Sequence, residues 1–412
     1  MRPASPPLTM RTTSGLGRFG SILCVLAVAL GPAHLSAQEP TAPQAPSAEQ
    51  LKSAIDKLGD FDYATRTAAA RTVRRTVASQ AVPALLQTVA EHADGYVRYR
   101  ALVLLTGFND PRTKEAMRES RTSPNDRLRS VAYSFFEHQP DAAMVGELVA
   151  ALDKEQGEFV RPSLVRALAA HGAVFDDQPL KQLLLREVGR GEDYFRSAVI
   201  EALGDYKAVY AYDALIAVAK LDGPLQDDAA LALGKIGDKR ALATLAALQQ
   251  TAPRQSQPTI AAAICALGVN CGSHQNYLIE TLKFADRNLG FQELLRGAAT
   301  GLGALAVAGG HDQAVDALFD VGIPSRDEST RAPVALALGM VALRKTPLMM
   351  TVLARRPDRD RAIELVAEGF DMLEEDLDKE AFFAAARRAY WDSPDESPSR
   401  VLMQTLIGKL DF

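Results

Sequence analysis

The chain has 412 residues, and its 46 basic and 51 acidic residues give a formal net charge of −5. This acidic balance excludes nonspecific nucleic-acid binding, which depends on neutralising backbone phosphates. Its three cysteines are too few for the disulfide framework of a small secreted protein.

The first 37 residues have the pattern of a secretory signal peptide. Three arginines precede an apolar run at 22–30, and small residues follow it up to Ala37. The run is well short of the roughly 20 residues that span a bilayer, so we expect no stable membrane insertion after cleavage, with a retained anchor as the alternative. Cleavage leaves 46 − 3 = 43 basic residues against 51 acidic ones, a net charge of −8. The sequence therefore predicts a periplasmic or secreted protein.

Residues 38–47 form a Pro-rich linker before the folded part. Ser47 and Gln50 then have the spacing of a capping box, which predicts a helix through residue 58. We interpret this helix as an N-terminal cap of the folded part.

One short pattern recurs nine times between residues 66 and 331, at intervals of 32, 31, 32, 35, 30, 34, 35 and 36 residues. Counted from each start, positions +3, +4 and +7 are always Ala, aliphatic or aromatic, which places them on one stripe of an α-helix. The starts are Arg66, Arg98, Arg129, Arg161, Arg196, Gln226, Ile260, Leu295 and Arg331.

A unit of this length holds two short helices and cannot bury its stripe alone, so neighbouring units must stack. The sequence predicts an all-α fold, an α-solenoid (superhelix) of about nine stacked antiparallel helix pairs over 48–345. A C-terminal helical cap follows at 346–412. Residues 371–380 contain six acids and one Lys. We interpret them as a solvated part of this cap in preference to an acidic docking tail.

The segment 225–245, LQDDAALALGKIGDKRALATL, closely resembles the HEAT-like repeat named after phycobiliprotein lyases, and the other units resemble it more loosely. The resemblance covers about residues 60–345. It implies an α-solenoid and, usually, a protein-interaction role. It does not imply lyase activity, since most proteins with such repeats are scaffolds.

Six of the nine units start with Arg, and an acid or amide and often an aromatic residue lie just before it. Such ladders on one rim could bind an extended peptide or acidic partner. The alternative, which we favour, is that the acids cap the first helices and the arginines bridge neighbouring repeats. The candidate rim residues are Tyr96, Arg98, Arg129, Phe159, Arg161, Tyr194 and Arg196.

The sequence offers little for catalysis or metal binding. Its histidines are scattered without an H-E-x-x-H pair, and neither a P-loop nor a G-x-S-x-G elbow is present. Cys265, Cys271 and His274 lack the C-x-x-C spacing of zinc sites. The two cysteines can form a disulfide only if the chain turns after Gly268, because a continuous helix would hold them about 9 Å apart.

We therefore expect an exported, noncatalytic repeat scaffold that binds a protein or extended peptide, with no catalytic residue, cofactor or metal. The alternative is an enzyme or chromophore-handling protein related to bilin lyases, with its active groove on the concave face.

Overall fold

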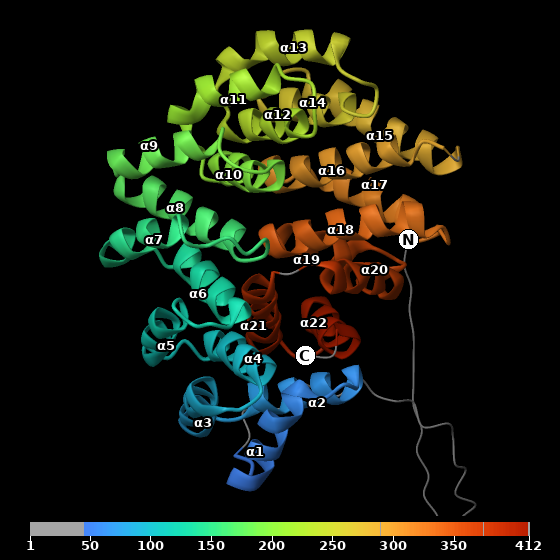
Figure 1. The fold of residues 1–412 in the computed structure, drawn as a ribbon. Coiled ribbons are helices and arrows are strands. Elements are labelled where there is room, and N and C mark those ends of the chain that lie inside the picture. Colours follow the sequence, from blue (N-terminus) through green and yellow to red (C-terminus); the bar gives the residue numbers. More distant parts are fainter. Residues whose placement is uncertain (1–44, 289, 374, 411–412) are drawn as a thin grey trace, which may run out of the picture. The chain divides into compact units, whose positions relative to one another are not determined.

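A computed structural model describes residues 45–288, 290–373 and 375–410. In these ranges every regular element is a helix and no strand occurs, so the predicted all-α fold is confirmed (Figure 1). The predicted signal peptide at 1–37, and most of the linker at 38–47, lie outside the described residues.

The folded part begins with the predicted cap. Helix α1 (Ala48–Asp56) runs into the 3-10 turn η1 (Lys57–Gly59). The capping box is confirmed, since the Ser47 hydroxyl accepts from the Gln50 N–H and the Gln50 side chain accepts from the Ser47 N–H.

The helices that carry the stripes pack against one another in chain order, and we call them the first-helix row. Every stripe residue of the nine repeats is buried, as predicted. The row consists of α2 (Tyr63–Arg75), α4 (Gly95–Leu105), α6 (Asp126–His138), α8 (Arg161–Phe175), α10 (Asp193–Asp205), α12 (Leu225–Ile236), α14 (Gln257–Ala266), α16 (Gln292–Gly309), α18 (Glu328–Arg344) and α20 (Arg359–Met372).

A second-helix row completes the pairs and covers one side of the first row (Figure 1). It consists of α3 (Ala78–Glu91), α5 (Arg112–Ser120), α7 (Val145–Leu152), α9 (Gln178–Glu187), α11 (Tyr212–Ala219), α13 (Leu242–Thr251), α15 (Cys271–Arg287), α17 (Asp312–Gly322) and α19 (Thr346–Arg355). Short 3-10 turns η2 (Thr106–Phe108), η3 (Ala142–Met144), η4 (Val209–Ala211) and η5 (Lys239–Ala241) lie between paired helices.

Glycines at position +8 set how closely the first helices approach. A Cβ on Gly204 or Gly234 would lie 2.7 Å from the Cα of Ala232 or Ala263, respectively, on the next first helix. Gly268 acts differently, since its φ of +78° turns the chain after α14. The same type of residue therefore serves close packing in some repeats and a chain turn in another.

Stacking does not stop at the expected boundary at residue 345. Helix α20 packs on α18, and a Cβ on Gly369 would lie 2.2 Å from the carbonyl oxygen of Ala335. Two helices then end the described chain, α21 (Asp376–Asp392) and α22 (Pro398–Leu410). Residues 346–373 thus extend the stack, and α21 and α22 form the terminal pair.

Within the described ranges, no single helix has the length and apolarity needed to cross a membrane. Helices α18 and α19 meet those criteria only when taken together, and they are bent by 117° relative to each other.

Candidate functional site

The start-position arginines hold the ends of the second helices. Arg98 donates from Nε to the Val89 carbonyl of α3 at 2.7 Å, and Arg161 donates from Nη1 to the Leu152 carbonyl of α7 at 2.6 Å. These carbonyls belong to the last turn of a helix, where no intrahelical donor reaches them. Each guanidinium thus fixes the second helix of the preceding repeat to the first helix of its own repeat.

Three of these arginines also pair with an acid further along the stack. Arg129 binds Glu155 at 2.8 Å, Arg161 binds Glu187 at 2.9 Å, and Arg331 binds Glu368 at 2.6 Å. The guanidiniums of Arg98, Arg129, Arg161 and Arg196 are therefore engaged by groups of their own chain. This geometry matches the favoured interpretation of the arginines as bridges between repeats.

Most of the acids before the arginines cap the first helices. The side chains of Asp62, Asp94 and Asn125 each accept a hydrogen bond from a main-chain N–H in the first turn of their helix. Asp193 differs, because it is the first residue of α10 and binds Arg196 on the same helix at 2.9 Å.

The aromatic residues of the predicted rim are the part that reaches solvent. Phe159 is 68% exposed, Tyr194 41% and Tyr96 36%, and Tyr63 at the matching place in the first repeat is 64% exposed. In the third repeat Arg127 takes this place, with its guanidinium 5.8 Å from the Tyr96 ring centre. Because all five residues lie at or just before the N-terminus of consecutive first helices, they follow one edge of the stack. We call Tyr63, Tyr96, Arg127, Phe159 and Tyr194 the aromatic rim.

The acidic segment is not the solvated cap expected from sequence, and that prediction is wrong. Helix α21 packs against α4, α6 and α18, and in Figure 1 it lies beside α4 and α6. Glu380 is buried and forms an ion pair with Arg74 of α2, 306 residues away in sequence. A charged side chain can be half or fully buried only where a group of opposite charge pairs with it. The sequence shows the run of acids, but no neighbouring residue indicates which distant residues pair with it.

A second charged network lies on the first-helix row between α6 and α12. Arg166 binds Glu137 and Asp205, each at 2.9 Å, and Lys235 binds Asp205 at 2.7 Å. Tyr206 donates to Glu137 at 2.9 Å, and burial raises the pKa of Tyr206 well above its usual value. Because these carboxylates are matched by cations or donors, we assign the network a structural role across four repeats.

His138 and His171 lie in adjacent repeats and make separate contacts. His171 is fully buried; its Nε2 accepts from the Asp141 N–H at 3.0 Å, and its Nδ1 lies 2.7 Å from the Ala167 carbonyl. This pattern fits a neutral imidazole that joins two repeats, and burial lowers its pKa. His138 instead reaches Asp378 of α21 at 3.6 Å.

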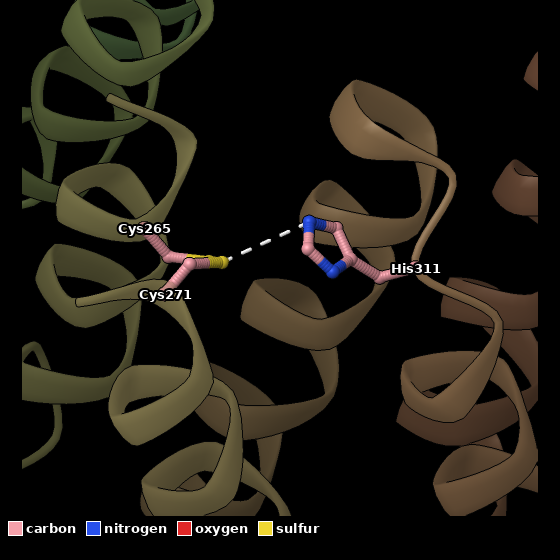
Figure 2. A group of neighbouring side chains, drawn as sticks. All are labelled: Cys265, Cys271 and His311. Atoms are coloured by element: carbon pink, nitrogen blue, oxygen red, sulfur yellow. Dashed lines mark hydrogen bonds between the residues drawn. A yellow bond between two sulfur atoms is a disulfide. The ribbon is translucent and has the colours of Figure 1, made fainter. Parts of the chain in front are cut away.

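Cys265 and Cys271 meet at the turn between α14 and α15, which Gly268 makes possible. Their sulfurs are joined and their Cα atoms lie 4.1 Å apart (Figure 2). His311, and not His274, completes the cluster, with its Nε2 3.8 Å from the Cys271 sulfur. The ligand atoms of these three residues lie within 4.8 Å of one another. Sulfurs joined in a disulfide are not thiolates, so in this state the cluster lacks the ligands that a metal ion requires.

The stacked pairs of antiparallel helices define an α-solenoid. Residues 51–137 match the family model of HEAT repeats, which confirms the predicted resemblance to HEAT-like repeats. No curated protein matches the chain.

Several solved structures are similar to the chain at low identity. One is the complex of CpcE and CpcF of phycocyanin lyase from Nostoc sp. PCC7120, at 21% identity over 64% of this chain and 97% of that one, with a TM-score of 0.39. Another is the Escherichia coli protein YibA, at 18% identity over 54% and 82%, also with 0.39. A third is Kap95p bound to RanGDP, at 10% identity, TM-score 0.37, where 88% of this chain spans 55% of the other. At these identities and TM-scores, the similarity implies nothing about activity or partners.

Proposed function

We propose that the chain is an exported, noncatalytic scaffold that binds a protein or extended peptide along the aromatic rim. The observation that carries this proposal is the placement of exposed rings, such as those of Phe159 and Tyr194, at the same end of successive first helices. Large aromatic side chains contribute much of the binding energy at protein interfaces and lose little conformational entropy. The adjacent arginines fix the backbone from which these rings project.

The alternative, an enzyme or chromophore-handling protein with an active groove on the concave face, finds less support. Acidic residues of α21 already occupy the first-helix row in the first three repeats.

The rim proposal is tested by capturing partners from the exported fraction with the mature protein as bait. We expect the double substitution Phe159→Ser/Tyr194→Ser to weaken capture of the main partner at least tenfold, as loss of hot-spot rings does. Tyr277→Ser on α15 is the matched control, since Tyr277 is 37% exposed but lies outside the rim. Equal capture by both variants and the unaltered protein would remove the rim as the binding surface.

Export has a separate test. We expect the intact mass of the exported protein to correspond to a chain that starts at Gln38, after the short apolar run and Ala37. A mass that includes Met1 would contradict cleavage and favour the retained anchor.

A further inference from the structure

The contact between α21 and the start of the stack consists mainly of charged and polar groups. Glu380 accepts from Arg74 Nε at 2.9 Å and from its Nη2 at 2.5 Å, and both side chains are less than a tenth exposed. One turn earlier, Asp376 accepts from the Tyr99 hydroxyl of α4 and lies 3.4 Å from Arg100. Two acids spaced i and i+4 thus face cations of two successive repeats.

A neighbouring strip of α21 meets α6 and α18. Asp378 lies 3.6 Å from His138 of α6 and 3.2 Å from Arg344 of α18, and Glu375 binds Arg344 at 3.0 Å. The acids at 375 and 378 are spaced i and i+3, which puts them on one side of the helix. Arg74, Arg100 and Arg344 therefore present cations to an acidic helix, and His138 presents an imidazole that is a cation when protonated. We call these four residues the basic groove.

The apolar side chains of α21 pack elsewhere. Phe382, Ala386 and Tyr390 belong to the core that runs from α14 to α22. Leu377 alone among the described α21 residues packs against the core of the earlier repeats. The apolar side of α21 thus anchors it to the later repeats, and its contact with the basic groove consists of the ion pairs together with Leu377 and the Phe383 ring, which lies 5.2 Å from the Arg74 guanidinium.

We propose that the basic groove is a docking site for an acidic helix, which α21 occupies in cis and which an acidic helix of a partner protein displaces. Charge complementarity identifies the partner's chemistry: carboxylates at helical spacing that match those at 375, 376, 378 and 380. This surface adjoins the aromatic rim, since the Tyr99 ring lies 5.5 Å from that of Tyr96, but the inference rests on the charged contacts of α21 and does not depend on the proposed rim function.

The test measures whether a free copy of the acidic helix enters the groove when the cis copy is weakened. The probe is a fluorescent peptide of residues 371–392, titrated into the full mature chain and followed by anisotropy. Asp376→Asn/Glu380→Gln removes two charges from α21 with little change of shape and leaves the groove intact. We expect this variant to bind the peptide at least tenfold more tightly than the unaltered protein, and increasing salt to weaken the binding.

Two controls separate docking from misfolding. Adding Arg74→Gln to the opened variant should reverse the gain at least tenfold, because it removes the partner of Glu380. A scrambled peptide of the same composition should bind no better to the opened variant than to the unaltered protein. If the opened variant and the unaltered protein bind the peptide equally, or if both peptides bind alike, the proposal is overturned.

Hydrogen exchange of α21 gives a second reading that does not use the peptide. Arg74→Glu should speed exchange in α21, and the charge swap Arg74→Glu/Glu380→Arg should restore slow exchange. Unchanged protection of α21 in the single variant would show that the ion pair does not hold the helix, and this too would overturn the proposal.

Discussion

Arg161 and Glu187 form a buried ion pair at 2.9 Å, with their side chains 9% and 1% exposed. The same guanidinium donates to the carbonyls of Leu152 and Glu155 in the preceding repeat. One side chain thus joins the ends of two successive second helices, α7 and α9. In a solenoid, where each repeat contacts only its neighbours, such bridges couple the repeats along the stack.

Arg161→Ala should lower the free energy of unfolding by about 3 to 5 kcal/mol, because it leaves Glu187 buried without its main cation. Arg196→Ala should cost less, since its acid partner Asp193 is on the same helix and 54% exposed. Urea denaturation measures both. Leu168→Ala is the control, with an expected loss of about 2 to 5 kcal/mol for a buried stripe residue. If the urea midpoint is unchanged in Arg161→Ala while Leu168→Ala is destabilised, the bridging role is contradicted and the arginines would instead belong to a binding surface.

Gly234→Ala should destabilise the protein by about 1 to 3 kcal/mol, because the new methyl group would push α12 away from Ala263 of α14. Gly146→Ala is the matched control in helix α7, where a Cβ meets no atom within 4 Å. That substitution should be neutral or stabilise by up to about 1 kcal/mol, since Ala favours the helix. Thermal unfolding of the two variants measures the difference, and a more stable Gly234→Ala protein would contradict the close contact of the first helices.

The Cys265–Cys271 pair is tested by thiol titration of the exported, denatured and unreduced protein. We expect no free thiol before reduction and two after it, because Cys24 lies in the segment predicted to be removed. Cys271→Ser, which leaves a single thiol in both conditions, is the control for access of the reagent. Two free thiols before reduction would show that the cysteines are not paired.

The stability that His138 and Glu375 contribute should fall as the pH rises from about 5 to 8, because both hold protons more tightly in the folded state. His171, whose pKa is lowered by burial, contributes in the opposite sense. The hydrogen bond to Asp378 raises the pKa of His138, with Glu137 adding to the effect. Burial raises the pKa of Glu375 to about 7 against the opposing charge of Arg344. A raised folded-state pKa contributes stability below the unfolded value, which is lost as the pH passes the folded value.

The measurement is the unfolding midpoint across this pH range. His138→Gln should flatten the part of the profile above about pH 6.5, and Glu375→Gln the part between about pH 4.5 and 7. Asp378 acts in the opposite sense, because its pKa is lowered and its contribution is lost only in acid. The same slope in His138→Gln and the unaltered protein would contradict the assigned role of His138.

Local pattern determined most of the fold. The stripe of Leu164, Val165 and Leu168 is buried as its helical spacing predicts, and the Ser47–Gln50 box begins α1. These features depend on residues within one or two helical turns of each other, so the spacing in the sequence is enough to predict their relative positions. The position of Phe159 just before a repeat start indicated a place on the rim, whereas the exposure of its ring came from the structure.

Tertiary structure alone decided what the acidic segment contacts. Residues 375–380 look like a solvated run of charge, yet Glu380 is buried against Arg74, 306 positions away. His311, in place of His274, joins Cys265 and Cys271 for a similar reason, since it comes from a different repeat. The small rotation from each repeat to the next accumulates along the stack and sets where its end meets its beginning. The total rotation depends on all the contacts between repeats, so it cannot be predicted from the spacing of residues within one repeat.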